Sequence, residues 1–211
     1  MMDDLRILFD GTPERHFLLA CIFIVMCCTV AVLAAVVVDF MQFSKRGGVR
    51  KEKKSVVETG TMMMFFFLYY LLLRSGAGTV AISSTGLRMA LAATGTLTVV
   101  AGCFVNIRGR LDLGQNWSNQ IRIYKDHSLV TDGVYGYVRH PLYASLIWMF
   151  TGSSLLYRNL LALLATMLIF APFMYYRAKQ EERMLEKEFE GYDAYRKKVG
   201  MFLPKPKSRQ S

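Results

Sequence analysis

The sequence predicts an all-α integral membrane protein with five transmembrane helices, and three observations support this prediction. Hydrophobic residues make up 53% of the 211 residues and charged residues only 20%, which exceeds the apolar content of ordinary globular domains. The apolar residues occur in long runs, which is typical of membrane spans. The basic residues, 26 against 16 acidic ones, lie between these runs, and this distribution favours a membrane over nucleic acid as the partner.

Each predicted helix corresponds to one apolar run that is long enough to cross a hydrocarbon core of roughly 30 Å at about 1.5 Å per residue. The five runs are residues 17–38, 56–73, 89–107, 141–157 and 159–176. The acidic start of the chain is unlike a cleavable signal peptide, so the first run is interpreted as a retained span. Only Arg158 separates the last two runs, which predicts an antiparallel helical hairpin.

The orientation follows from the basic residues of the connecting segments, because positively charged loops stay on the cytoplasmic side. Residues 45–54, 108–139 and 177–209 share one side of a five-helix arrangement and contain 21 of the 26 lysines and arginines. The N-terminus is therefore predicted to lie outside and the C-terminus inside. The strongly basic segment at 45–54 predicts contact with anionic membrane lipids.

The chain divides into two predicted regions. Residues 1–107 form an N-terminal region with the first three transmembrane helices, and residues 108–211 form a catalytic region. The catalytic region contains a cytoplasmic loop, the helical hairpin and a cytoplasmic C-terminal helix. This last helix is predicted to be amphipathic and to fold back on the membrane helices, since apolar residues recur at helical spacing. They are Leu185, Phe189, Tyr192, Tyr195 and Val199.

Several common motifs are absent from the sequence. It has three histidines and no HxxxH, HExxH or clustered Cys/His pattern, so no metal site is predicted. It also lacks GxGxxG, GxxxxGK[ST] and GxSxG, which argues against the usual soluble nucleotide-binding and hydrolase folds.

The first polar cluster is GVYGYVRHPLY, residues 133–143, directly before the fourth predicted helix. Pro141 suits the first turn of a helix, because its missing N–H would be unpaired there anyway. The free N–H groups of that turn, beside Arg139 and His140, predict a carboxylate or phosphate site. The simpler alternative is that Arg139 reaches lipid headgroups while His140 only caps the helix.

The second cluster contains Arg177 and Glu181, which lie at positions i and i+4 of one helical face. A surface ion pair is the simpler interpretation. However, the tight hairpin must place the start of the fourth helix beside the end of the fifth. His140 and Glu181 are therefore predicted to converge on one ligand that carries both a carboxylate and an ammonium group.

These segments resemble a known family. DHSLVTDGVYGYVRHPLYASL and the later EERMLEKEFEGYDAYRKKV look like the C-terminal half of the isoprenylcysteine carboxyl methyltransferase family, which is related to the phospholipid N-methyltransferases. The resemblance covers about residues 112–204 and suggests a prokaryotic-type member. It implies an integral membrane methyltransferase that uses S-adenosylmethionine and releases S-adenosylhomocysteine.

The resemblance also implies roles for particular residues. Arg177 would lie near the carboxylate of a lipophilic acceptor that enters from the bilayer. The implied cofactor contacts are Gln120, His127, Ser128, Leu129, Val130, Tyr135, His140, Pro141, Leu142, Tyr143 and Glu181.

The preferred acceptor is the carboxylate of an isoprenylated cysteine or a similar small lipid-like molecule. Three alternatives remain open: a phospholipid amine N-methyltransferase, an NADPH-dependent membrane reductase of the sterol or enone type, and a non-catalytic membrane module. The expected location is a multi-pass position in the plasma or inner membrane, with the active site on the cytoplasmic face.

Overall fold

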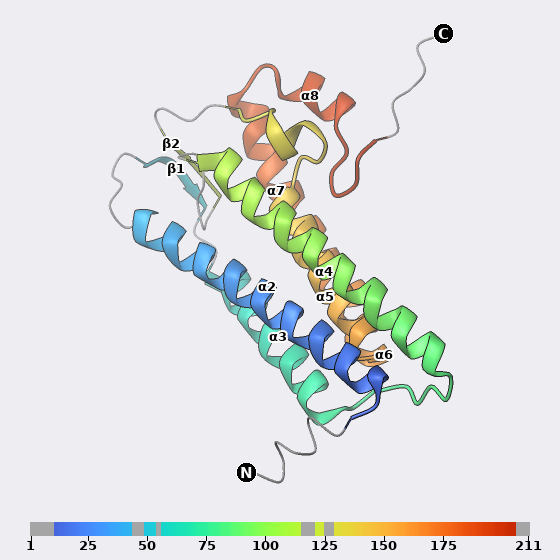
Figure 1. The fold of residues 1–211 in the computed structure, drawn as a ribbon. Coiled ribbons are helices and arrows are strands. Elements are labelled where there is room, and N and C mark those ends of the chain that lie inside the picture. The colour runs from blue at the N-terminus through green and yellow to red at the C-terminus, as the bar shows by residue number, and fades with distance from the viewer. Residues whose placement is uncertain (1–10, 44–48, 54–55, 115–120, 125–128, 206–211) are drawn as a thin grey trace.

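The computed structural model describes residues 11–43, 49–53, 56–114, 121–124 and 129–205, and it is mostly helical (Figure 1). Long helices run roughly along one direction, and a polar cap of shorter elements covers one end. The membrane-length part contains α2 (Pro13–Phe43), α3 (Val56–Ser75), α4 (Thr85–Leu113), α5 (Pro141–Leu156), α6 (Leu160–Ala165), η3 (Thr166–Phe170) and α7 (Ala171–Glu188). The cap contains β1 (Val49–Lys53), β2 (Ile121–Tyr124), η2 (Gly133–Gly136) and α8 (Tyr192–Lys198).

Helices occupy all five apolar runs. Within the described ranges, three helical stretches are long and apolar enough to cross a membrane, namely Pro13–Asp39, Thr85–Leu113 and Leu160–Glu188. The second run forms a shorter apolar helix over Gly60–Ser75, and α5 has only 16 residues. The helical, membrane-type fold is thus confirmed, whereas the number of five spans and their orientation stay predictions.

One feature departs from the expected all-helical fold. Strands β1 and β2 pair antiparallel and place Val49 opposite Tyr124, with an irregularity before Lys51. The first strand lies in the basic segment and the second lies between α4 and η2. Their sequences, VRKEK and IRIY, are short and interrupted by charged residues, so neither contains an apolar run that would predict a transmembrane element.

The most extensive helix contact in the structure joins α4 and α5. A Cβ added to Gly95 would collide with the carbonyl oxygen of Gly152, and one added to Gly102 would lie 2.7 Å from the side chain of Met149. Small residues allow such close approach of two backbones, which is how apolar helices commonly pack in membranes. The glycines therefore fix the position of α5, and with it the residues at its N-terminus.

The predicted hairpin is confirmed. Helix α5 ends at Leu156, and Asn159 caps α6 because its side-chain oxygen accepts a hydrogen bond of 2.8 Å from the amide of Ala162. The Asn159 Nδ2 also donates to the carbonyls of Leu72 and Ala77, which ties the turn to the end of α3. From α6 the chain passes through the π-helical turn η3 into α7, so the helix after the hairpin returns to the polar end.

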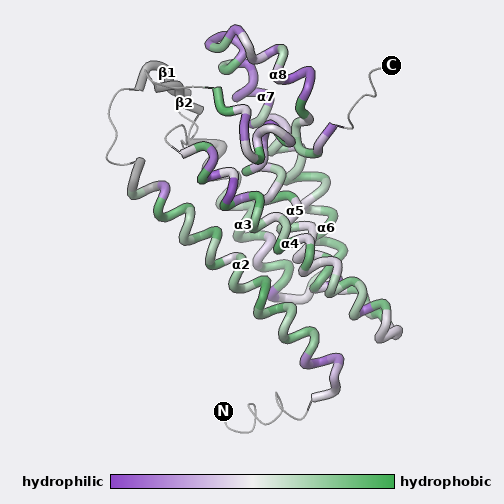
Figure 2. The backbone as a smooth tube through the Cα atoms, turned by 45° about the horizontal axis from the view of Figure 1, so that its top comes forward, coloured by the Kyte–Doolittle hydropathy of each residue, from purple (hydrophilic) through white to green (hydrophobic). Residues whose placement is uncertain are grey.

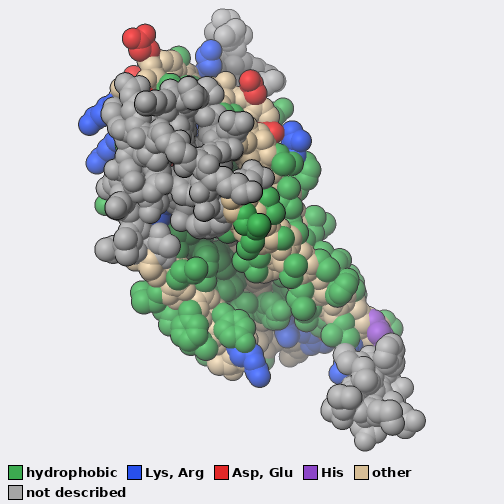
Figure 3. All heavy atoms as spheres, turned by 90° about the vertical axis from the view of Figure 1, so that its left-hand side faces the viewer, with side chains coloured by type: hydrophobic (Ala, Val, Ile, Leu, Met, Phe, Trp, Pro, Cys, Tyr) green, Lys and Arg blue, Asp and Glu red, His purple; other side chains and the backbone are tan. Residues whose placement is uncertain are grey.

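The middle of the molecule is apolar on its surface as well as inside. Figure 2 shows hydrophobic segments along the helices and hydrophilic segments at the ends, most clearly in α7 and α8. Figure 3 shows hydrophobic side chains across the middle of one face, with basic side chains toward both ends. Large hydrophobic residues such as Phe23, Leu97 and Leu168 are more than half exposed. Such a broad apolar surface is typical of a protein in contact with lipid.

The predicted amphipathic C-terminal helix is wrong as one continuous element. Helix α7 ends at Glu188, Phe189 adopts an extended conformation, and α8 begins at Tyr192. The apolar face is nevertheless used as expected, since Tyr192, Tyr195 and Val199 form a buried cluster. The break lets α8 turn back over the polar end instead of extending away from it (Figure 1).

Candidate active site at the polar end

The candidate site lies where the start of α5 meets the middle of α7. As predicted, Pro141 occupies the first turn of α5 and His140 is the N-cap residue. The short helix η2 precedes them. Asp112 of α4 binds its N-terminal end, because its carboxylate accepts a 2.9 Å hydrogen bond from the amide of Val134. Two contacts with α4 therefore position the start of α5: the hydrogen bond from η2 to Asp112, and the close packing of α5 on Gly95 and Gly102.

His140 and Glu181 are brought together, as the hairpin predicted. The His140 Nδ1 lies 3.5 Å from Glu181 Oε2, and its Nε2 lies 3.4 Å from Glu182 Oε1. The imidazole ring also stacks against Tyr143 with a centroid distance of 5.7 Å. A single buried histidine is thus held between two consecutive carboxylates of α7.

Burial opposes protonation of His140, but the hydrogen bonds that its ring donates to Glu181 and Glu182 outweigh this effect and raise the pKa of the imidazole above its ordinary value. Tyr135 of η2 is also buried, and burial, followed by the nearby charge of Glu181, raises the pKa of its phenol. These shifts favour the protonated form of the imidazole and the neutral form of the phenol beside a carboxylate.

Glu181 and Glu182 have different surroundings. The Glu181 side chain is 36% exposed, whereas that of Glu182 is 2% exposed. Glu182 accepts hydrogen bonds from Arg139 and from Lys179 as well as contacting His140. Of these two glutamates, Glu181 is therefore the one that presents an accessible carboxylate beside the histidine.

The role predicted for Arg139 is wrong. Its side chain is 6% exposed and points neither to lipid headgroups nor to an open anion site. It pairs with Glu182 and also donates hydrogen bonds to the backbone carbonyls of Arg196 and Val199. A guanidinium has enough donors to join three segments at once, so Arg139 connects α5, α7 and the end of α8.

The C-terminal segment is hydrogen bonded to the residues that precede α5. The amides of Arg139 and His140 donate to the carbonyls of Gly200 and Met201 at 2.8 and 3.1 Å. The Tyr195 hydroxyl donates to the carbonyl of Tyr135 at 2.7 Å. Leu129 packs against the same apolar cluster as Tyr195. The predicted folding back of the C-terminal region onto the membrane helices is thus observed.

Arg177 lies one turn before Glu181 on α7 and is buried. Its charge acts on both Glu181 and Tyr143, so the guanidinium lies near the same polar cluster. Arg177 lies on the membrane side of Glu181 along the helix. This is a position from which a cation can meet the polar end of a molecule whose tail remains among the helices.

A second set of hydrogen-bonded polar side chains links α5, α4 and α2. The Asn106 Nδ2 donates to Ser145 Oγ at 2.7 Å, and Asn106 accepts a hydrogen bond from Arg110 Nε at 2.8 Å. Arg110 in turn pairs with Asp39 of α2. The carboxylate of Asp39 therefore joins α2 to α4.

Of the residues that the sequence proposed for the cofactor, Gln120, His127 and Ser128 lie outside the described residues. The structure gathers Tyr135, His140, Tyr143 and Glu181 directly at the polar end, and Pro141 and Leu142 follow in the first turn of α5. Leu129 and Val130 lie in the loop before η2, half-buried.

Sequence reasoning missed two contacts of this site: the ion pair of Arg139 with Glu182, and the hydrogen bond that the Tyr195 hydroxyl donates to the carbonyl of Tyr135. The EE pair at 181–182 was a possible signal, since two adjacent carboxylates on one helix face different directions.

A bundle of apolar helices with a polar cluster at one end defines a class of helical membrane-type proteins, and comparison with known proteins shows which family it resembles. Residues 94–187 match the model of the isoprenylcysteine carboxyl methyltransferase (ICMT) family. This match confirms the resemblance found in the sequence. The matched region includes both helices that carry His140 and Glu181.

Individual relatives agree with the family match. The chain is 35% identical over 106 residues to the protein-S-isoprenylcysteine O-methyltransferase of Schizosaccharomyces pombe, covering 49% of this chain and 45% of the relative. It is 32% identical over 117 residues to the human enzyme of the same name, covering 54% and 41%. The chain thus spans about half the length of the curated relatives it matches.

The fold is also similar to a solved structure of the eukaryotic intramembrane Ras methyltransferase ICMT. The TM-score is 0.51 and the identity 25%, and the match covers 72% of this chain and 53% of the solved one.

Proposed function

We propose that the protein is a membrane methyltransferase that transfers a methyl group from S-adenosylmethionine to the carboxylate of an isoprenylated cysteine or a similar lipid-like acceptor. The observation that carries this proposal is the contact of His140 Nδ1 with Glu181 Oε2, 3.5 Å apart, within the region that matches the methyltransferase family. It supplies a cation and an accessible anion side by side.

These residues fit the amino-acid part of the cofactor. A methionine moiety carries one carboxylate and one ammonium group, and the site offers protonated His140 with the N-terminus of α5 for the first and Glu181 for the second. Glu181 is exposed enough to exchange its contact with His140 for a ligand. Glu182 stays engaged with Arg139, so a negative charge remains next to the imidazole when the ligand binds.

The wider set of cofactor contacts is proposed by analogy with the family. Tyr135, Leu129 and Val130 would line the adenosine and methionine parts. Together the proposed contacts are Gln120, His127, Ser128, Leu129, Val130, Tyr135, His140, Pro141, Leu142, Tyr143 and Glu181.

When bound, the cofactor supplies a methyl group on a sulfonium, and its transfer to a carboxylate oxygen forms a C–O bond, breaks the C–S bond and moves no proton. The chain's own contribution is therefore positioning and exclusion of water. Arg177 would orient the acceptor carboxylate by charge-assisted hydrogen bonds. The buried cluster of Tyr192, Tyr195 and Val199, fastened over η2 and the start of α5, would keep water from the reacting groups.

The membrane arrangement proposed for this function has five spans, with the N-terminus outside and the polar end in the cytoplasm. The basic segments at 45–54 and 177–209 support this orientation. Residues 1–107 would provide the N-terminal helices and residues 108–211 the catalytic region. The plasma or inner membrane is the proposed location, and the lipophilic acceptor would enter from the bilayer.

Calorimetric titration of detergent-purified protein with S-adenosylhomocysteine and, separately, with NADPH tests the proposal. We expect binding of S-adenosylhomocysteine that Glu181→Ala weakens at least tenfold. Binding of NADPH alone would indicate the reductase alternative, and absence of both would indicate a non-catalytic module. Methyl transfer to a phospholipid amine but not to a prenylated cysteine would keep the chemistry and replace the acceptor.

A further inference from the structure

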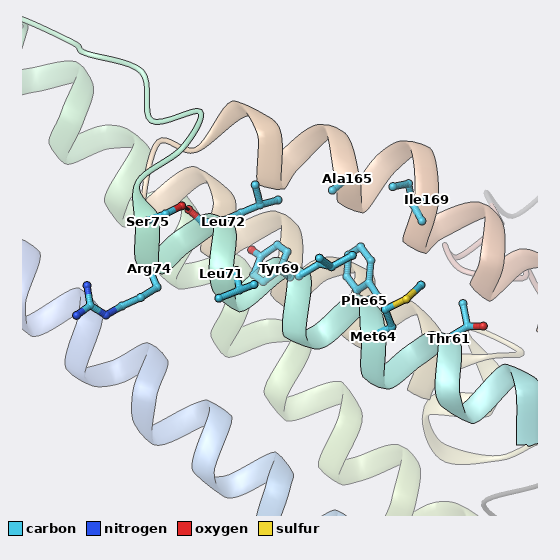
Figure 4. Close-up of a pocket in the computed structure, with 11 residues that line it drawn as sticks. Thr61, Met64, Phe65, Tyr69, Leu71, Leu72, Arg74, Ser75, Ala165 and Ile169 are labelled. Carbon is cyan, nitrogen blue, oxygen red and sulfur yellow. Dashed lines mark hydrogen bonds between the residues drawn. The ribbon is translucent and has the colours of Figure 1, made fainter.

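A groove of about 780 Å³ lies between α3 and the segment formed by α6 and η3, away from the candidate active site (Figure 4). Side chains of α3 form one wall, including Met64, Phe65 and Leu72, and Ala165 and Ile169 form the other. Figure 4 shows these residues arranged along the length of α3, from Thr61 at one end to Arg74 and Ser75 at the other.

The walls of the groove are apolar even where a polar residue contributes to them. The Tyr69 hydroxyl turns into the protein, where it donates to the carbonyl of Phe150 at 2.6 Å and lies 3.0 Å from Ser154 Oγ. Leu68 and Ile169 are 49% and 59% exposed at the groove. The groove therefore has apolar walls and exposed apolar side chains, and it lies on a bundle of membrane-length helices. Such a surface suits a hydrocarbon chain from the bilayer.

Arg74 is the charged residue among those that line the groove, and it lies at one end of it. Asn159 hydrogen bonds to Leu72 and Ala77, so this end adjoins the turn between α5 and α6. His140 lies at the opposite end of α5, a helix of 16 residues, or about 24 Å at 1.5 Å per residue. The groove's basic end and the candidate active site are therefore on opposite ends of the bundle.

We propose that this groove is a binding site for one acyl chain of an anionic phospholipid, with the phosphate headgroup beside Arg74. From Thr61 to Arg74 the groove follows α3 for about 20 Å at 1.5 Å per residue, which exceeds the roughly 15 Å depth of one leaflet. A chain anchored at Arg74 therefore stays in contact with α3 through the whole leaflet. The guanidinium suits a phosphate, because its donors match the phosphate oxygens.

The same geometry argues against the methyl acceptor as the occupant. An acceptor whose polar end bound at Arg74 would place its carboxylate on the far side of the bundle from Arg177 and Glu181. The lipid is instead a structural ligand that fills the space between α3 and α6. On this side of the bundle, Phe65 and Tyr69 pack α3 against Ala162 and Phe170.

Fluorescence quenching by brominated lipids measures this binding without methyl transfer, so the result is independent of the proposed enzymatic activity. The two tryptophans are replaced in a Trp117→Phe, Trp148→Phe background. A reporter is then introduced in the groove as Leu68→Trp. Its matched control is Leu97→Trp, on α4, which is 69% exposed and does not line the groove. Each protein is reconstituted in phosphatidylcholine vesicles containing brominated phosphatidylglycerol or brominated phosphatidylcholine.

We expect the groove reporter to prefer phosphatidylglycerol and the control reporter to show a ratio near one. Arg74→Gln should reduce the preference about fivefold, the effect of one basic residue near an anionic surface, and Arg74→Lys should retain most of it. A ratio near one at Leu68→Trp, or a preference unchanged by Arg74→Gln, would overturn the proposal. Displacement of the brominated lipid by N-acetyl-S-farnesylcysteine would also overturn it and assign the groove to the acceptor.

Discussion

Arg139 donates two hydrogen bonds to the same carboxylate oxygen of Glu182, from Nε at 2.9 Å and from Nη2 at 2.8 Å. This Oε1 atom also lies 3.4 Å from Nε2 of His140, while Lys179 binds the other oxygen at 3.2 Å. Glu182 is therefore shared by three basic side chains. Its neighbour Glu181 faces a more open position, so two adjacent carboxylates have separate tasks: one holds the site together and the other remains accessible.

Glu182→Gln should destabilise the protein by about 3 kcal/mol, because it leaves the buried charge of Arg139 without a counter-charge. Chemical unfolding in detergent, followed by circular dichroism, measures the change. Glu186→Gln is the matched control, since Glu186 lies on the same helix as Glu182 but forms a partly exposed ion pair, with Arg196. Its loss should cost less than about 1 kcal/mol. Equal effects of both variants would contradict the assignment.

Glu181→Gln should instead change ligand binding with little change in stability, because the side chain is 36% exposed. We expect at least a tenfold weaker affinity for S-adenosylhomocysteine by calorimetry, since a carboxylate is lost from the proposed ammonium site. The unfolding midpoint serves as the control and should remain close to that of the unchanged protein. Unaltered affinity would remove Glu181 from the cofactor site.

Stability should depend on pH through His140. Its pKa is raised in the folded protein, so its contribution is fully present below the ordinary histidine pKa of about 6.5 and is lost as the pH rises through the folded-state value. The difference in free energy of unfolding between the unchanged protein and His140→Gln should therefore decrease on going from pH 6 to higher pH. A difference that grows with pH would show that the histidine is held neutral.

Arg177→Gln should reduce methyl transfer to a prenylated cysteine by about a hundredfold while affinity for S-adenosylhomocysteine stays within a fewfold. The physical reason is the loss of charge-assisted hydrogen bonds to the acceptor carboxylate. Rates measured with a radiolabelled methyl donor test the first part and calorimetry the second. If Arg177→Gln weakened product binding instead, Arg177 would belong to the cofactor side of the site.

Gly95→Ala should destabilise the protein by about 1–3 kcal/mol, because its added Cβ meets the backbone of α5 at Gly152, which cannot move aside as a flexible side chain can. Gly60→Ala on α3 is the control. Nothing lies within 4 Å of its added Cβ, and alanine favours helix, so stability should be unchanged or slightly higher. Thermal unfolding of the two variants compares them, and a tolerated Gly95→Ala would show that α4 and α5 can separate.

The sequence by itself determined the helices and one important juxtaposition. Apolar runs specify membrane-type helices because hydrocarbon demands continuous apolar length. Pro141 specifies the start of a helix, since its ring suits the first turn. The single basic residue Arg158 between two runs requires a hairpin, and the hairpin alone brings His140 to α7, where it contacts Glu181.

Only the tertiary structure decided what the neighbouring charges do. Arg139 and His140 are adjacent in sequence, yet the first is engaged with Glu182 and with carbonyls near residue 199, which lie about sixty residues away along the chain. No local sequence pattern predicts which carboxylate a buried guanidinium pairs with. For Arg139 the pairing depends on the break between α7 and α8, because this break folds the C-terminal segment back onto it. The position of α8 therefore separates an accessible carboxylate, Glu181, from a structural one, Glu182.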